Sequence, residues 1–410
     1  MTFLPLNGFP PASADDESLT AGGNAVRPMR DARGVCGIVL AGTHHWGDGA
    51  FERVLRGPLL PIAHTPLIEY PLQWLRDAGI ASVVLCANSA TQSLRTVLGD
   101  GAPGSMSLSY FEDDEPRGPA GCARDAALMT SASTFIVIEG TIIPTLDFGA
   151  LIDAHRASQA TATVVVEFDR RRRGMASGVR RQPAGIYVFE REALTSVAQH
   201  GYQDIKEGLL GRLNGEGEHV AMHEVHGLSA KVLDYASYAA VSRWLVSSSI
   251  ERPVFLPNYT RVGEGMFHPS ATVHRSASII GPVLLGEGVI VEEGAIVVGP
   301  ASVGARSIIA SNAIVSRSFI WDDCVIGSGS SVDSSLLADR SVVVPGDQLK
   351  NATVADSSSP VEPPPADVLA ASIALDARMR AGGGAEGRRS SVSGAVGNDV
   401  RSARISESLT

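Results

Sequence analysis

The stretch from Val35 to Ile80 decides the fold of the first half of the chain. It reads VCGIVLAGTHHWGDGAFERVLRGPLLPIAHTPLIEYPLQWLRDAGI. The continuous apolar run from Val35 to Leu40 is typical of a strand that is buried on both faces. A glycine-bearing loop follows, then a proline-rich loop over 57–66 and an amphipathic helix over 66–78. This order of strand, loop and helix predicts the start of a nucleotide-binding α/β domain.

The same alternation of strand-like and helix-like segments continues to about residue 250. The expected strands are 35–40, 82–87, 107–111, 134–139, 161–168 and 185–189, and the expected helices are 66–78, 90–98, 121–129, 148–158, 202–213 and 237–246. Alternation of this kind predicts a Rossmann-like, mostly parallel sheet with helices on both faces. Ligands of such sheets bind at the carboxyl ends of the strands, which indicates the loops after Leu40, Phe111 and Glu139.

From Phe267 onward the sequence has a period of six residues. Large apolar residues recur in register at Phe267, Val273, Ile279, Leu285, Val291, Val297, Val303, Ile309, Val315 and Trp321. Two places before the later ones stand Ala271, Ala277, Val283, Val289, Ala295, Ala301, Ser307, Ala313 and Phe319. This repeat predicts a left-handed parallel β-helix in which the large residue fills the interior and the other residue occupies a tight corner. The register is expected to slip by one residue at Ile326.

Length and composition divide the chain into four expected segments. They are a disordered leader over 1–33, an α/β domain over 34–250, a hexapeptide-repeat β-helix over 251–354 and a mostly disordered tail over 355–410. A net charge of -10 and a pI near 5.5 argue against a nucleic-acid or anionic membrane partner. The acidic N-terminus lacks an apolar signal segment, and the four separated cysteines indicate reduced thiols, so we expect a cytoplasmic protein.

Several motifs together resemble one enzyme family. They are L-A-G at 40–42, P-L-L-P-I at 58–62, P-L-I-E-Y-P-L-x-W-L-x-x-A-G-I at 66–80, A-G-I-Y-V-F at 184–189 and the hexapeptide repeat. The chain resembles the sugar-1-phosphate nucleotidyltransferases, or NDP-sugar pyrophosphorylases, in particular the mannose-1-phosphate guanylyltransferase-like branch. The resemblance implies that 34–250 is a nucleotidyltransferase-like domain, which in the family joins a nucleoside triphosphate to a sugar 1-phosphate with Mg2+ and releases pyrophosphate.

On the nucleotide side, the resemblance implies binding residues but no complete catalytic set. The positions that match are Leu40, Ala41, Gly42 and Thr43 in the first loop, and Glu115, Gly118, Ala120 and Gly121 in the segment that opens a helix. Gly47 stands where the family has its arginine, and Gly57 where it has the lysine of P-K-P. A glycine cannot neutralise the charge that develops on phosphate oxygens, so the catalytic residues remain unidentified.

On the sugar and metal side, the resemblance implies Gly140, Thr141 and Gly185 as sugar-side residues and Asp234 as a metal ligand. Thr141 replaces one of the family's two metal aspartates, which leaves Asp234 alone to hold Mg2+. Arginines at 170–173 and 180–181 stand in place of the family's E-K-P element. They either bind a phosphate or form a solvated hairpin tip.

Three hypotheses follow. The first is a sugar-nucleotide-binding or regulatory subunit, catalytically weak or inactive, that forms a homo-oligomer or pairs with an active paralogue. The second is an active nucleotidyltransferase with relocated groups, for example Arg53, Arg56 and Asp48. The third is an assembly protein in which the β-helix supplies the oligomer interface.

Overall fold

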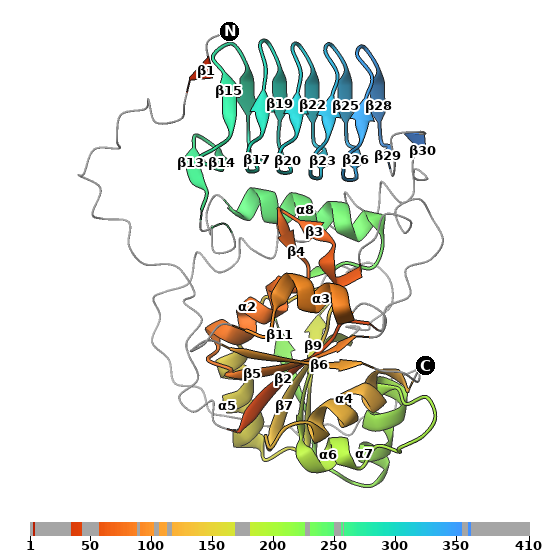
Figure 1. Cartoon of the computed structure of the whole chain (residues 1–410). Coiled ribbons are helices and arrows are strands. Elements are labelled where there is room, and N and C mark those ends of the chain that lie inside the picture. The colour runs from red at the N-terminus through yellow and green to blue at the C-terminus, as the bar shows by residue number, and fades with distance from the viewer. Residues whose placement is uncertain are drawn as a thin grey trace, which may run out of the picture.

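The fold is that of a computed structural model, shown in Figure 1. It describes residues 3–4, 34–42, 57–87, 91–101, 106–112, 117–168, 181–225, 230–249, 256, 258–354 and 360–361. The predicted disordered leader and tail therefore lie almost wholly outside the described residues. Within the described part, no helix is long and apolar enough to cross a membrane.

A seven-stranded sheet forms the centre of the α/β domain. Its strands are β2 (Val35–Leu40), β5 (Ser82–Ala87), β6 (Ser107–Glu112), β7 (Thr134–Glu139), β9 (Ala162–Phe168), β10 (Arg181–Glu190) and β11 (Val220–Val225). They lie in the order β11-β9-β10-β7-β2-β5-β6, and β10 alone is antiparallel to its neighbours. The predicted mostly parallel sheet is confirmed. Strand β11 was not predicted, because His223 and Glu224 interrupt its apolar residues and none of its residues is fully buried.

Helices cover both faces of this sheet, as predicted. One face carries α2 (Glu69–Asp77), α3 (Thr91–Leu98) and α5 (Phe148–Ser158). The other carries α4 (Gly118–Leu128), α6 (Arg191–Thr195), the π-helix η3 (Ile205–Leu210) and α7 (Gly211–Gly215). Strand β2 is buried throughout, with Val39 in one core and Ile38 in the other, which is why its sequence shows no alternation. Figure 1 shows α5 and α4 on opposite sides of the sheet.

The second half of the chain is a β-helix made of three faces whose strands pair in parallel, except that β1, β13 and β30 each pair antiparallel with a neighbour. The first face contains β13 (Thr260–Val262), β14 (Gly265–Phe267), β17 (Val283–Leu285), β20 (Ala301–Val303), β23 (Phe319–Ile320), β26 (Leu336–Leu337), β29 (Thr353–Val354) and β30 (Pro360–Val361). The second contains β1 (Phe3–Leu4), β15 (Thr272–His274), β18 (Ile290–Val291), β21 (Ile308–Ile309), β24 (Val325–Ile326) and β27 (Val342–Val343). The third contains β16 (Ser278–Ile280), β19 (Ile296–Val298), β22 (Ile314–Ser316), β25 (Ser331–Asp333) and β28 (Gln348–Lys350). The predicted left-handed β-helix is confirmed.

The predicted register is correct from Phe267 to Val315 and wrong at Trp321, whereas Ile326 lies in the interior as predicted. Val303 pairs with Ile320, so Ile320 fills the interior in place of Trp321. The slip therefore lies before Ile320 and not at Ile326, and each later coil is one residue shorter. The six-residue period could not distinguish Ile320 from Trp321, because both are apolar and they are adjacent in the sequence.

The corner that was assigned to Phe319 is occupied by Ser318, which is fully buried. Its hydroxyl oxygen accepts a hydrogen bond from the backbone N–H of Ser335 at 3.0 Å. The hydroxyl oxygen of Ser335 in turn accepts one from the N–H of Ala352 at 3.1 Å. Serine fits this position because it is small and satisfies a buried amide of the next coil.

Helix α8 (Tyr235–Ser249) joins the two parts of the molecule, between the β-helix and the α/β domain (Figure 1). The indole N–H of Trp321 donates to the hydroxyl of Tyr238 at 2.9 Å, and that hydroxyl donates to the carbonyl of Pro61 at 3.1 Å. Pro61 belongs to the short hairpin of β3 (Pro61–Ile62) and β4 (Thr65–Pro66). Phe319 packs edge-on against Tyr238, with ring centroids 5.9 Å apart. The two apolar residues misplaced by the repeat thus form part of a core that both parts share.

Candidate functional site

The carboxyl ends of β2 and β7 lie in direct contact. The N–H of Gly140 donates to the carbonyl of Leu40 at 2.9 Å, and the N–H of Ala41 donates to that of Cys86 at 2.7 Å. A β-carbon on Gly140 would lie 2.9 Å from the oxygen of Leu40, so only glycine permits this approach. Leu40, Ala41 and Gly140 therefore form one continuous backbone edge at the position predicted for ligand binding.

Thr141 and Asp234 lie on neighbouring segments of this edge. Strand β8 (Ile142–Ile143) pairs with β12 (Ala230–Lys231), and the N–H of Val232 donates to the carbonyl of Thr141 at 2.9 Å. Asp234 comes directly before α8, and its Oδ1 accepts hydrogen bonds from the N–H of Ser237 at 2.8 Å and from its hydroxyl at 2.7 Å. Its carboxylate thus caps a helix.

The residues at this edge do not fit a Mg2+ site of the usual kind. Thr141 offers a neutral hydroxyl, and one oxygen of Asp234 is already engaged by Ser237. In the part of the chain that the structure describes, no three His, Cys, Asp or Glu side chains are grouped to hold a metal ion. Mg2+ prefers carboxylate oxygens together with phosphates and waters, so these two side chains offer a poor cradle.

The beginning of α4 is tied to the edge by the segment before η3. The N–H of Ala120 donates to the carbonyl of Gln203 at 3.0 Å, and the N–H of Gln203 donates to that of Arg117 at 2.7 Å. Gly118 and Gly121 lie in the same first turn of the helix. Three residues after Gln203, the side chain of Lys206 contacts Glu139 at the end of β7. The predicted residues of α4 and of β7 are therefore connected through one short segment.

That connection is an ion-pair cluster around Glu139, the last residue of β7. Lys206 Nζ lies 3.6 Å from Oε1 of Glu139, and Lys231 Nζ lies 3.5 Å from its Oε2. Gly185 has φ +82°, and a β-carbon there would lie 2.6 Å from Cδ of Glu139, so the carboxylate rests directly on glycine. Burial, and then the negative charge of Glu139, raise the pKa of the Tyr187 hydroxyl, which therefore stays protonated at neutral pH.

Comparison with known proteins agrees with this geometry. A family model described as Nucleotidyl transferase matches residues 52–179. A mannose-1-phosphate guanylyltransferase of Mycobacterium tuberculosis is 24% identical over 268 residues, covering 58% of this chain and 71% of that protein. A glucose-1-phosphate thymidylyltransferase of Mycolicibacterium smegmatis is 26% identical over 254 residues, covering 56% and 83%. Bifunctional protein GlmU of Pelobacter propionicus is 24% identical over 278 residues, covering 58% and 60%.

The chain is similar to the sugar-1-phosphate nucleotidyltransferases, and the family model and these relatives support its relationship to that family. This family is related to NDP-sugar synthesis. Among the positions where this chain lacks a charged residue of the family, Gly57 and Thr141 lie in the described part. Gly57 begins the short helical turn η2 (Gly57–Leu59) with φ +53°, and a β-carbon there would have nothing within 4 Å. The position is therefore open, and it carries no cation.

Several predicted positions fall outside the described residues. They are Thr43, Gly47, Asp48, Arg53, Arg56, Glu115 and the arginines at 170–173 and 180.

Glu139, Lys206 and Lys231 were not identified from the sequence. No motif joins them, because they come from a strand end, a π-helix and a two-residue strand far apart in the chain. One signal was available. Lysine occurs only at positions 206, 231 and 350, whereas the chain has 34 lysines and arginines together.

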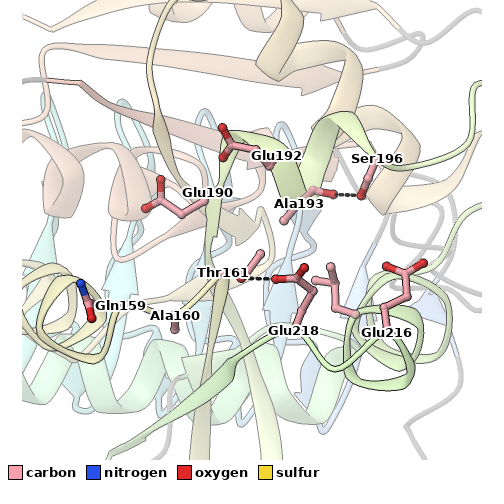
Figure 2. Close-up of a pocket in the computed structure, with 10 residues that line it drawn as sticks. Gln159, Ala160, Thr161, Glu190, Glu192, Ala193, Ser196, Glu216 and Glu218 are labelled. Carbon is pink, nitrogen blue, oxygen red and sulfur yellow. Dashed lines mark hydrogen bonds between the residues drawn. The ribbon is translucent and has the colours of Figure 1, made fainter.

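A pocket of about 460 Å³ lies at the opposite, amino edge of the sheet (Figure 2). Its lining includes Glu190, Glu192, Glu216 and Glu218. Thr161 donates a hydrogen bond to Glu218 at 2.6 Å, and Glu190 lies 3.0 Å from His155 and accepts a bond from Thr134 at 3.0 Å. No basic side chain is among the lining residues, so the pocket is unsuited to phosphate and is not the candidate site.

Proposed function

We propose that the chain binds a sugar nucleotide, or its nucleotide and sugar-phosphate precursors, at the carboxyl edge of the sheet. It turns them over weakly or not at all and acts as a binding or regulatory subunit. The observation that carries this proposal is Thr141, a neutral residue hydrogen-bonded into the β8–β12 edge where the family has a metal-binding aspartate.

The backbone of the site supports the binding half of the proposal. Leu40, Ala41, Gly140 and Gly185 pack closely against one another or against neighbouring residues, and so fix the backbone at the carboxyl ends of the strands, where ligands of such sheets bind. Binding through such backbone edges does not require the charges that catalysis requires. A sugar nucleotide is therefore the ligand class that best fits what the chain keeps.

The missing charges support the second part of the proposal, which is that turnover is weak or absent. In phosphoryl transfer, charge on the attacking, central and leaving oxygens is neutralised by cations and metal. Gly47, Gly57 and Thr141 replace three charged family residues. Removal of one such stabilising donor typically lowers kcat by about 10² to 10³, and losses within one site do not simply add. Turnover should therefore be very slow.

The alternative is an active nucleotidyltransferase of the mannose-1-phosphate guanylyltransferase type with relocated groups. Arg53 or Arg56 would then reach the phosphates, and Asp48 would join Asp234 on Mg2+. The position of Arg56 beside Gly57 in the sequence favours this alternative. These three residues lie outside the described part of the chain.

We further propose that the protein works in the cytoplasm as a homo-oligomer, or as a hetero-oligomer with an active relative. The proposed division is 34–250 for the nucleotidyltransferase domain and 251–354 for the β-helix, between a leader and a tail. The shared core around α8 supports treating these two domains as one folded unit.

Calorimetry with a panel of nucleoside triphosphates and NDP-sugars, with and without Mg2+, tests the binding claim. We expect at least one NDP-sugar to bind, with little dependence on Mg2+, because Asp234 is the one carboxylate left at the two metal positions of the family. If no nucleotide or NDP-sugar binds the full chain, the proposed function is wrong. Binding that requires Mg2+ would favour the active alternative.

A further inference from the structure

Lysine is scarce in this protein, and its placement is uneven. The chain carries its positive charge almost entirely on arginine, and its lysines are Lys206, Lys231 and Lys350. Two of these three contact the same carboxylate, that of Glu139, at the carboxyl edge of the sheet. Arginine and lysine differ in that lysine is a compact charge with three rotatable donors, which suits a ligand phosphate as well as a fixed carboxylate.

The two ammonium groups have room to bind a ligand. Their contacts with Glu139 are long, at 3.6 and 3.5 Å, and Lys231 also donates to the carbonyl of Pro183 at 3.5 Å. The side chains of Lys206 and Lys231 are 44% and 23% exposed, and that of Glu139 is 26% exposed. Each lysine side chain is therefore partly exposed to solvent, while a single carboxylate contacts both ammonium groups.

The surroundings of Glu139 favour a ligand that has hydroxyl groups beside a negative charge. Gly140 packs closely against Leu40 and Ala41, and Gly185 packs closely against Ile142 and Glu139, so the two glycines fix the backbone and the carboxylate of Glu139 at this edge. The carboxylate of Glu139 accepts hydrogen bonds, and the buried, protonated hydroxyl of Tyr187 lies near it. The nearby acid Asp204 directs its Oδ1 to the N–H groups of Lys206 and Glu207, where it caps η3.

We propose that Lys206 and Lys231 bind the phosphate attached to the sugar of the ligand, and that Glu139 accepts a hydrogen bond from a sugar hydroxyl. The two lysines would supply the phosphate-binding charge that Gly47 and Gly57 no longer provide. The inference rests on the proposed function, since it names residues for the sugar-phosphate part of the same ligand. It adds a specific prediction, because the cations come from η3 and β12 and not from the family's loops.

The test is calorimetric binding by the full chain of hexose 1-phosphate, NDP-sugar and inorganic phosphate. The variants are Lys206→Gln and Lys231→Gln, with Lys206→Arg and Lys231→Arg as charge-preserving partners. Lys350→Gln is the matched control, because Lys350 is exposed on β28 of the β-helix. Thermal unfolding of every variant separates a loss of binding from a loss of fold.

We expect each glutamine variant to bind the sugar phosphates about ten- to a hundredfold more weakly, as for the loss of a charged hydrogen bond. The arginine variants should recover part of this loss, and Lys350→Gln should bind like the wild type. Glu139→Gln should weaken hexose 1-phosphate more than inorganic phosphate, which a purely structural ion pair would not do.

Two outcomes contradict the inference in different ways. If the wild type binds an NDP-sugar and the lysine variants bind it equally well, the lysine assignment is wrong while the proposed function stands. If the wild type binds none of the sugar phosphates or NDP-sugars, the proposed function itself is wrong. Affinity for hexose 1-phosphate but not for NDP-sugar would place a free sugar phosphate, and not a sugar nucleotide, at the two lysines.

Discussion

The β-helix and the carboxyl edge of the α/β sheet are built from different kinds of contact. In the β-helix, the same solution recurs in each coil: an interior residue such as Leu285 or Val303 pairs with its counterpart in the next coil. At the sheet edge, each feature depends on one residue from a separate element, as with Glu139, Lys206 and Gly185. Stability is therefore spread over many similar contacts, whereas binding should depend on a few single ones.

The largest effect that tests this contrast should come from the β-helix interior. Leu285 is fully buried, so Leu285→Ala should lower the free energy of unfolding by about 2–5 kcal/mol through lost burial and a cavity. Chemical denaturation measures this loss. Ile280→Ala is the control, because Ile280 is 54% exposed on the same β-helix and should change stability little. Loss of ligand affinity in a folded Leu285→Ala protein would contradict the separation of stability from binding.

The next effect should come from Gly185. Its φ of +82° disfavours any other residue, at a cost of about 1–3 kcal/mol. The new β-carbon of Gly185→Ala would also lie 2.4 Å from Ile142 and 2.6 Å from Glu139, which would displace the carboxylate. We expect lower stability in thermal unfolding together with weaker sugar-phosphate binding.

Gly217→Ala is the matched control for Gly185→Ala. Gly217 has φ +81°, and a β-carbon there would have nothing within 4 Å. It should therefore lose stability from backbone strain alone and keep its affinity. Equal loss of affinity in both variants would show that backbone strain, and not the position of Glu139, controls binding.

A pH-dependent effect should come from the junction between the two regions. His64 Nδ1 lies 2.8 Å from the hydroxyl of Tyr259, and its Nε2 is buried with no hydrogen-bond partner among the described residues. Burial lowers the pKa of His64 to about 4 from 6.5. The unfolded chain therefore binds this proton more readily, so stability should fall as the pH drops from about 6.5 to about 4.

Urea denaturation across this pH range measures that slope, which for one group is at most about 1.4 kcal/mol per pH unit. His64→Asn should have a flatter profile than the wild type between these pH values and the same profile above them. Identical slopes in the two proteins would show that His64 is not the group responsible.

Much of the fold could be predicted from the sequence, since it is encoded in local patterns. The apolar run 35–40 follows from the burial of a strand on both faces, and the six-residue period follows from the repeated coils of the β-helix. Trp321 and Phe319 were misplaced because their partner, Tyr238 on α8, lies outside the repeat. The backbone frame of the site was predictable from glycines, whereas the cluster of Glu139, Lys206 and Lys231 was not. It exists only once strand end, π-helix and short strand have packed together.

The measurement that tests the central claim most directly is pyrophosphate release by the full chain with Mg2+. It should be run over a panel of nucleoside triphosphates and hexose 1-phosphates, beside calorimetric binding of the corresponding NDP-sugars. We predict binding together with turnover slower than about 0.01 s⁻¹, which follows from a typical kcat of about 10 s⁻¹ reduced by about 10³ for lost charge stabilisation. Turnover at about 1 s⁻¹ or faster with any pair of substrates would contradict the account.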